Sequence, residues 1–371
     1  MNKTVCLYYE DQYLKEFEAD VLSCTQVKDG LYDIILDKTA FFPEQGGQIC
    51  DIGTIDDVAV KDVQIKNDII HHYCEKPMEI GRMVKGKIDF VRRYDLMQNH
   101  TGEHLLSGIV HNRYGYENVG FHLNDHLCTV DYDGELTDAQ IDELEILVNK
   151  AIYENITVEV SYPSKEELNS INFRSKKEIE NQIRIVTIGD KDCCACCAPH
   201  VTSTGEIGII KVIDRKKHKN GVRLTLLCGE RALKDYQSIH KTVKQAAQFY
   251  STSPDNIMER IRASENQIAE LRHQLNSLMT DILIARLKTE KILFLDDVDQ
   301  NTAIKAVNEY IDDEEFHAVF AGSDETGYRV ISNNSDMVRI STLDFKGGNK
   351  GKMFFGKAQA TAAEIRSFFL K

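Results

Sequence analysis

The sequence predicts an α+β protein in four parts: an N-terminal β-barrel-like domain, an α/β core, a helical coiled-coil stalk and a small C-terminal α/β domain. Three observations support this fold class. Strand-like and turn-rich segments fill the first part, an apolar heptad repeat runs through the third, and short strand-like and helix-like segments alternate in the fourth. The predicted parts are residues 1–90, 91–230, 231–290 and 291–371.

Local patterns predict the elements of the first two parts. A strand at 31–36 precedes a turn-rich segment at 41–48, and a helix is expected from about 92 to 112. A capping-box sequence at Thr137 predicts the start of a second helix. The Asn220-Gly221 dipeptide lies between two strand-like runs, which is typical of a β-hairpin.

The third part contains a predicted long helix with one apolar face. Ser253 and Pro254 give a favourable helix start, and apolar residues then recur at spacings of four and three from Ile257 to Ala285. Such a seam needs a partner, because soluble monomers rarely expose a long apolar stripe. The sequence therefore predicts a homodimer through the 254–286 helix. A helical hairpin within one chain is the alternative.

The composition excludes several classes of protein. The 371 residues are 42% hydrophobic and 28% charged, as in an ordinary globular protein with a sizeable core. No run of eighteen apolar residues occurs, so we expect no transmembrane helix and no membrane partner. The N-terminus lacks a signal-peptide-like stretch, so we expect a cytoplasmic location. The ten cysteines should then be reduced and suited to metal binding.

The net charge of −14 argues against a protein that coats nucleic acid through its overall charge. Two local basic patches are nevertheless candidates for phosphate contacts, one at the predicted hairpin tip and one in the glycine-rich tail. Solvated surface charge is the alternative for both patches. The candidate nucleic-acid-binding residues are Arg215, Lys216, Lys217, Lys219, Lys350 and Lys352.

Two segments carry residues that suit a metal ion. His100 and His104 lie on one face of the predicted helix, since four residues turn a helix by about 400°. Residues 193–200 add thiols and His200, and this mixture of nitrogen and sulfur ligands suits Zn²⁺. A buried structural cysteine cluster is the alternative. Spacing alone does not identify the thiolate ligand among Cys193, Cys194, Cys196 and Cys197.

Together these motifs resemble the long form of the AlaX proteins, which are stand-alone relatives of the alanyl-tRNA synthetase editing domain. The resemblance lies in the glycine-rich segment 39–48, the histidine-bearing helix 93–106 and the second metal segment 185–208. It covers the chain nearly end to end. The last eighty residues resemble, more loosely, the tail domain shared by alanyl-tRNA synthetases and DHH phosphoesterases.

The resemblance implies roles for individual residues. The family pattern places a cysteine four residues before the last histidine, which selects Cys196 and His200, with His100 and His104, as Zn²⁺ ligands. It also implies that Thr39 and Gln48 border the amino-acid pocket. In that case Thr39 would bind a serine hydroxyl and Gln48 would orient water or substrate; their alternatives are a strand-end threonine and a turn cap.

The implied activity is hydrolysis in trans of tRNA(Ala) mischarged with serine or glycine. An alanine site cannot reject the smaller glycine by size and discriminates serine poorly, so a second site is needed. No synthetase core is expected before this domain, and ATP binding is not expected for catalysis. Pro199 resembles the editing domain of threonyl-tRNA synthetases, so seryl-tRNA(Thr) is an alternative substrate. A non-catalytic tRNA-binding zinc protein is a further alternative.

One acidic residue lies between the two helix histidines. Glu103 is predicted on a different face of the helix from His100 and His104. We therefore expect it to be solvated or to support the ligands from outside. Whether the zinc ion is catalytic or structural stays open, because four protein ligands leave no position for water.

Overall fold

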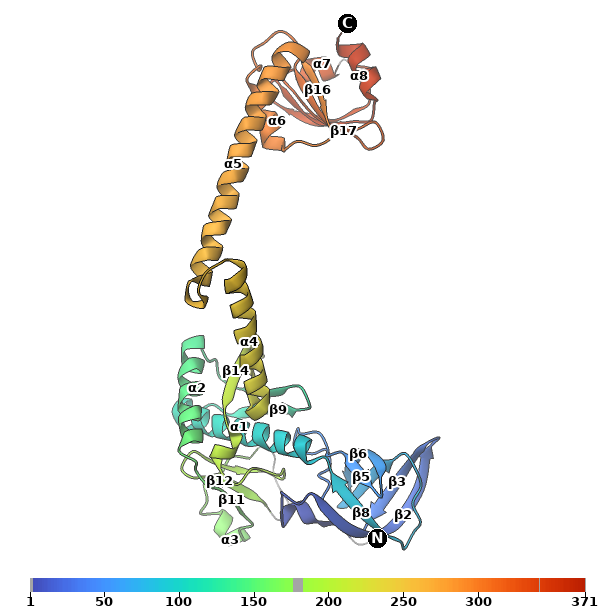
Figure 1. Cartoon of the computed structure of the whole chain (residues 1–371), viewed down its shortest axis with the longest axis vertical. Helices are drawn as coiled ribbons and strands as arrows, with labels where there is room; N and C mark the ends of the chain where they lie inside the picture. Colours follow the sequence, from blue (N-terminus) through green and yellow to red (C-terminus); the bar gives the residue numbers. More distant parts are fainter. Residues whose placement is uncertain (1–2, 176–182, 340, 371) are drawn as a thin grey trace. The chain divides into compact units, whose positions relative to one another are not determined.

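The computed structural model describes residues 3–175, 183–339 and 341–370. The chain divides into two compact units, residues 1–241 and 242–371, which are described separately (Figure 1). Both units combine helices with sheets, which confirms the mixed α and β class. No helix among the described residues is long and apolar enough to span a membrane.

The first unit begins with a barrel. Its six strands close in the order β2-β3-β7-β6-β5-β8. In β2, Phe17, Ala19 and Val21 alternate with exposed residues and fill the barrel interior, as the period of a strand requires. A short parallel pair joins β1 to β4 at its side. The bounds are β1 (Val5–Cys6), β2 (Glu16–Lys28), β3 (Leu31–Leu36), β4 (Lys38–Thr39), β5 (Gly53–Ile55), β6 (Val58–Lys66), β7 (Ile69–Cys74) and β8 (Met83–Ile88).

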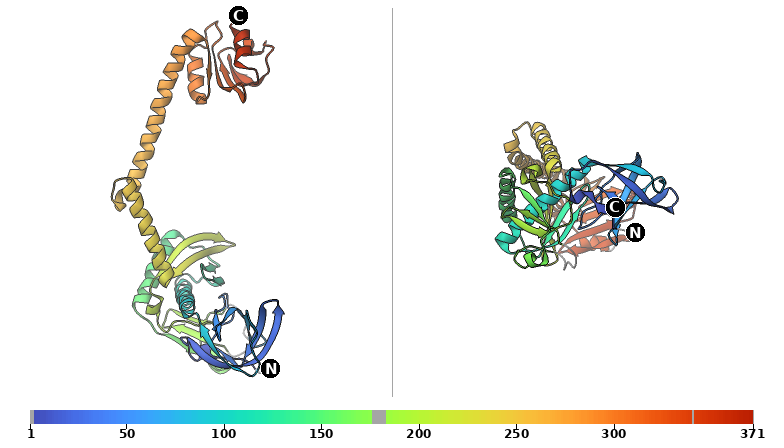
Figure 2. Two further views of the ribbon diagram at one scale, coloured as in Figure 1. Left: turned by 45° about the vertical axis from the view of Figure 1, so that its right-hand side comes forward. Right: turned by 90° about the horizontal axis from the view of Figure 1, so that it is seen from below.

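Helix α1 (Phe90–Tyr114) is the central element of the first unit. Asp89 caps its start and Gly115, in the left-handed conformation, ends it. Its residues from Leu96 to Val110 are buried almost throughout, because α1 packs against α2, β13, β15 and the 3₁₀ turn at Thr204–Ile207. In the left view of Figure 2, α1 (teal) lies between the barrel (blue) and the green helix and strands of this unit.

Two antiparallel sheets and a second helix complete the first unit. One sheet has the order β14-β15-β10-β9 and the other β11-β12-β13. Helix α2 (Asp138–Tyr153) begins with the predicted capping box at Thr137 and packs on α1. The strands are β9 (Asn118–Leu123), β10 (Cys128–Tyr132), β11 (Val158–Ser161), β12 (Ile185–Ile188), β13 (Asp192–Ala195), β14 (Ile210–His218) and β15 (Gly221–Cys228), with the short helix α3 (Lys165–Leu168) after β11.

The second unit contains a five-stranded sheet with the order β16-β17-β18-β20-β19. Helices cover its faces, and the last two turns of α5 bury Leu283 and Leu287 in its core. Helix α4 (Gly229–Phe249) leads from the first unit into it. The bounds are α5 (Ile257–Glu290), β16 (Ile292–Leu295), α6 (Gln300–Asn308), β17 (Ala318–Ser323), β18 (Gly327–Ser332), α7 (Ser335–Arg339), β19 (Phe345–Lys350), β20 (Met353–Ala358) and α8 (Ala362–Phe369).

The predicted heptad seam lies on one continuous helix, α5, which has 34 residues. Its middle part exposes Leu271, Leu275 and Leu278, with 55%, 59% and 61% of their surface accessible. The seam therefore has no cover along this stretch within the described chain. The homodimer and the coiled coil stay predictions.

Candidate metal centre

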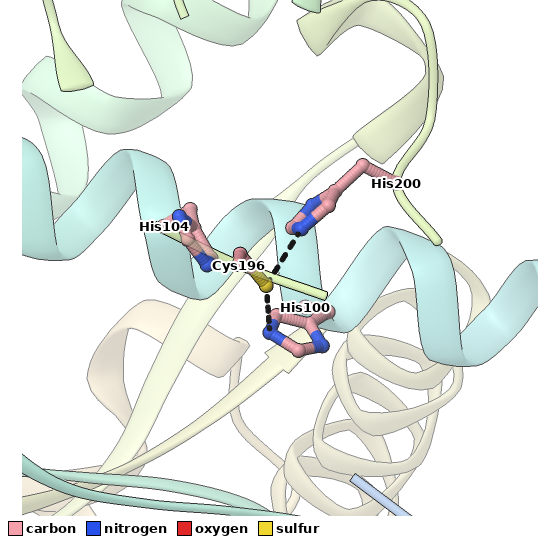
Figure 3. A group of neighbouring side chains, drawn as sticks. All are labelled: His100, His104, Cys196 and His200. Carbon is pink, nitrogen blue, oxygen red and sulfur yellow. Dashed lines mark hydrogen bonds between the residues drawn. The ribbon is translucent and has the colours of Figure 1, made fainter. Parts of the chain in front are cut away.

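Four side chains converge beside the middle of α1 (Figure 3). His100 and His104 come from consecutive turns of the helix, as their spacing predicts, while Cys196 follows β13 and His200 lies on the loop beyond it. One ligand atom from each of these four residues lies within 4.8 Å of the others. The three histidine residues are 4% exposed or less, so they are largely shielded from water.

Hydrogen bonds fix the orientation of two imidazoles. His100 Nδ1 lies 2.6 Å from Gln48 Oε1, and His200 Nδ1 lies 3.0 Å from Thr101 Oγ1. Because the Thr101 hydroxyl donates to the Met97 carbonyl at 2.8 Å, its oxygen accepts from His200. Both histidines therefore carry their proton on Nδ1. The lone pair of each Nε2 is left for another partner.

The geometry of these donors fits a metal ion. Cys196 Sγ lies 3.6 Å from His100 Nε2 and 3.3 Å from His200 Nε2. In a tetrahedral site with Zn–S and Zn–N bonds of about 2.3 and 2.0 Å, sulfur and nitrogen lie roughly 3.6 Å apart. The distances, the three nitrogens and the sulfur thus match a group that could hold zinc.

The charge of the centre favours Cys196 as the thiolate. Burial raises the pKa of the Cys196 thiol, but the three imidazoles around it outweigh burial and hold the pKa well below its ordinary value. Burial raises the pKa of Cys194, so that side chain stays a thiol. A second group of possible ligands contains Cys194 with His104 and Asp192, so the choice of Cys196 stays a prediction.

The glycine-rich loop 45–48 brings Gln48 to the centre. A Cβ atom on Gly47 would lie 2.5 Å from the Phe121 carbonyl oxygen, and the φ of Gly47 is +86°, so this position requires glycine. The close approach lets Leu123 N–H donate to the Gly47 carbonyl at 2.8 Å. Gln48 is fully buried. Its Oε1 faces His100, and its Nε2 has no hydrogen-bond partner among the described residues.

Hydrogen bonds with two neighbouring residues hold the buried Thr39 side chain. Its hydroxyl lies 2.8 Å from His72 Nε2, and His72 Nδ1 lies 3.0 Å from the Ile34 carbonyl oxygen. Since a carbonyl only accepts, His72 donates through Nδ1, and Thr39 must donate to Nε2. Burial lowers the pKa of His72 to about 4, so the ring is neutral. Phe41 N–H donates to Thr39 Oγ1 at 3.1 Å, which leaves that oxygen one lone pair.

A buried ion pair that the sequence did not reveal joins α1 to the barrel loop, residues 40–52 between β4 and β5. The Arg93 guanidinium donates from Nε to both carboxylate oxygens of Asp51, at 2.8 and 2.9 Å, and from Nη2 to the Ala40 carbonyl at 2.6 Å. Phe42 N–H donates to the same carboxylate at 2.6 Å. Both charged side chains are almost completely buried. The pair therefore fixes the glycine-rich segment against the metal-bearing helix.

The solvated alternative for Glu103 is wrong. Glu103 is 1% exposed, and its carboxylate accepts hydrogen bonds from Ser107 Oγ and Asn118 Nδ2, both at 2.5 Å. Ser107 also contacts the Tyr132 hydroxyl at 2.9 Å. Glu103 thus joins α1 to β9 and, through Ser107, to β10, away from the two histidines. The sequence places its face correctly but contains no signal for the depth of burial.

The first predicted basic patch is largely neutralised. Its three leading cations each contact a carboxylate: Arg215 with Asp138 at 2.7 Å, Lys216 with Asp214 at 2.6 Å and Lys217 with Glu135 at 3.2 Å. In the second unit, Lys352 contacts Asp312 at 2.8 Å. Among the described residues, Lys219 and Lys350 have no carboxylate within ion-pair distance.

Comparisons with known proteins match two segments of the first unit to families of tRNA synthetase domains. A model of class II (A) tRNA synthetases matches residues 3–92, and a model of the second additional domain of threonyl and alanyl tRNA synthetases matches residues 183–225. The alanyl-tRNA editing protein AlaX-L of Pyrococcus horikoshii is 34% identical over 286 residues, which are 72% of this chain and 70% of that protein.

Two further similar proteins, an editing protein and a ligase, differ in how much of their length this chain covers. The alanyl-tRNA editing protein Aarsd1 of Rattus norvegicus is 28% identical over 295 residues, 75% of this chain and 72% of that protein. The alanine–tRNA ligase of Pyrococcus furiosus is 33% identical over 294 residues, which cover 75% of this chain but only 32% of the ligase. The chain thus spans about a third of the ligase and most of each editing protein.

Proposed function

Because the chain belongs to the alanyl-tRNA editing protein family, we propose that it removes serine from mischarged tRNA(Ala) and acts more weakly on glycine. The protein is a hydrolase that deacylates mischarged tRNA(Ala) in trans. The observation that carries the proposal is the His₃Cys group beside the buried Gln48 amide. A binding protein without activity has no need of such an amide at its metal centre.

Four residues would hold the zinc ion: His100, His104, Cys196 and His200. When bound, the ion would supply a fixed positive charge beside the ester, and it lacks an open coordination position while all four ligands are engaged. An aminoacyl ester is already activated, so correct placement of the ester and of water provides much of the catalysis. The protein's own polar groups must provide that placement.

Gln48 is the group best suited to this placement. Its Oε1 is used by His100, so the amide cannot rotate freely, and its free Nε2 donor stays inside a buried site. A buried donor without a partner costs about 1–3 kcal/mol. An ester carbonyl oxygen that accepts from Nε2 would remove this cost and gain the hydrogen bond as negative charge develops on it.

Thr39 is proposed to recognise the serine side chain. Its hydroxyl proton is used by His72 and only one lone pair of its oxygen is free, so a serine hydroxyl would have to donate to Thr39. Glycine and alanine have no hydroxyl to offer. This arrangement would favour serine over both, which is the discrimination that an alanine-charging site cannot achieve by size.

A Thr39→Val variant is expected to lose serine hydrolysis more than glycine hydrolysis, by about fivefold, because one neutral hydrogen bond contributes about 1 kcal/mol. It should also be less stable, by roughly 1–3 kcal/mol, since the buried His72 Nε2 and Phe41 N–H lose their partner. Thr39→Ser keeps the hydroxyl and is the matched control. Equal losses for both amino acids in Thr39→Val would show that Thr39 only shapes the pocket.

A deacylation assay tests the proposed substrates directly. Seryl-tRNA(Ala) should be hydrolysed fastest, glycyl-tRNA(Ala) more slowly, and alanyl-tRNA(Ala) should be spared. Faster hydrolysis of seryl-tRNA(Thr) would favour the threonine-type alternative that Pro199 raises. Binding of all four tRNAs without hydrolysis of any would favour the non-catalytic alternative. Lys219 and Lys350 are proposed to contact tRNA phosphates, because neither has a carboxylate within ion-pair distance among the described residues.

We also propose that α5 pairs with the same helix of a second copy. Changing Leu271 and Leu278 to glutamate should convert a dimer into a monomer, because each change places a charge in the apolar seam. Changing Asn266 and His273 to glutamate adds the same charge on the opposite side of the helix from the seam and is the control. Light scattering on the full chain gives the mass. A monomeric parent chain would contradict the dimer.

A further inference from the structure

The third imidazole of the centre, His104, has a hydrogen-bond partner of a different kind from the other two. Its Nδ1 lies 3.0 Å from Asp192 Oδ2, and the side chains of His104 and Asp192 are 6% and 1% exposed. His100 and His200 contact a neutral amide and a neutral hydroxyl at the same position. An ionised carboxylate only accepts, so it holds the His104 proton on Nδ1 and leaves Nε2 free.

A second residue fixes this carboxylate. Arg174 donates to the other oxygen of Asp192, Oδ1, from Nε at 2.8 Å and from Nη2 at 2.7 Å. The two oxygens are therefore divided, one for the arginine and one for the histidine. The Arg174 backbone is also fixed, because its N–H donates to the Cys193 carbonyl at 2.8 Å and its carbonyl accepts from Ala195 N–H at 2.9 Å.

The buried carboxylate of Asp192 needs a compensating charge. A buried carboxylate loses its hydration, and a single hydrogen bond to an imidazole does not offset that loss. Arg174 supplies the compensating charge from a side chain that is only 11% exposed. A carboxylate behind a metal-binding histidine fixes the ring orientation and makes its other nitrogen a stronger ligand.

We propose that Asp192 and Arg174 are positioning residues that orient His104 toward the metal and set how tightly the metal binds. The inference rests on the proposed metal centre. The chain order supports it, since Asp192 begins β13 and Cys196 directly follows this strand. The same short segment thus provides one ligand and the residue that orients another.

The test is zinc affinity, measured by competition with a chromogenic chelator. Asp192→Asn should weaken zinc binding by about 10–100-fold, the usual effect of removing such a partner. Asp190→Asn is the matched control, because Asp190 is exposed and contacts only Lys191 among the described residues. Its affinity should equal that of the parent chain. An unchanged affinity in Asp192→Asn would overturn the proposal.

Two Arg174 variants separate positioning from simple structural support. Arg174→Met should also weaken zinc binding, Arg174→Lys should restore part of it, and Arg174→Met added to Asp192→Asn should cause little further loss, because both act through one hydrogen bond. Fully additive losses would overturn the proposal. The Co²⁺ spectrum should keep its thiolate charge-transfer band in every folded variant, since Cys196 is unchanged. Loss of this band in Asp192→Asn would also count against the positioning role.

This experiment distinguishes two failures. A parent chain that binds no zinc would contradict the proposed metal centre, and the positioning role with it. A parent chain that binds zinc tightly, with an equally tight Asp192→Asn variant, would contradict the positioning role alone. Deacylation rates are not needed for either outcome.

Discussion

A Cys196→Ser variant is expected to lose its metal and to lose deacylation of seryl-tRNA(Ala) by more than about 100-fold. The Cys196 sulfur lies 3.6 Å from His100 Nε2 and 3.3 Å from His200 Nε2, as expected of a ligand to the same ion. A serine hydroxyl is not ionised near neutral pH and is a poor zinc ligand. Loss of a direct ligand should exceed the 10–100-fold cost of losing an outer hydrogen bond.

Metal analysis of the purified chain and deacylation rates measure this effect together. Cys193→Ser is the control, because Cys193 lies on β13 with its sulfur 3.7 Å from the Thr187 hydroxyl and outside the ligand group. It should keep one zinc per chain. If Cys196→Ser kept its metal while Cys193→Ser lost it, the thiolate ligand would be Cys193.

An Asp51→Asn variant is expected to destabilise the first unit by about 3–5 kcal/mol, because it leaves the buried Arg93 charge without a counter-ion. The barrel loop should also move away from α1, since Asp51 holds the Phe42 N–H as well. Gln48 lies on this loop, so deacylation should fall in the fraction that remains folded. Urea denaturation followed by far-UV circular dichroism gives the stability change.

The neighbouring arginine provides the matched control. Arg92 contacts Asp125; the arginine side chain is 14% exposed, but the carboxylate side chain is 50% exposed and open to solvent. Asp125→Asn should therefore change stability by less than about 1 kcal/mol. Similar losses in both variants would mean that the Arg93–Asp51 pair contributes no more than a surface ion pair.

Only part of the candidate metal centre could be predicted from the sequence. The four-residue spacing was sufficient to place His100 and His104 on one face of a helix. It could not identify Cys196, because the positions of neighbouring cysteines depend on how the chain leaves β13. The Arg93–Asp51 and Arg174–Asp192 pairs stayed invisible, since partners 42 and 18 residues apart leave no local periodic signal.

The fold shows the same division between local and distant information. The strand at 31–36, the capping box at Thr137 and the hairpin near 220 are local patterns, and the structure contains all three. The hairpin differs by one residue: His218 pairs with Gly221, so residues 219–220 form the turn. Lys219 adopts the left-handed conformation there, with φ of +51°. The burial of Glu103 depends on tertiary packing, which no local pattern encodes.

The contacts around the glycine-rich loop restrict how this protein could have arisen or be rearranged. The ion pair from Asp51 to Arg93, the backbone bond from Leu123 to Gly47 and the amide of Gln48 on His100 all cross residue 90. A gene fusion or deletion with its boundary there would leave Asp51 and Arg93 without their counter-ions. It would also leave His100 without the amide that orients its ring. Transfer between a ligase and a free-standing chain would therefore have to keep the barrel and helix α1 together.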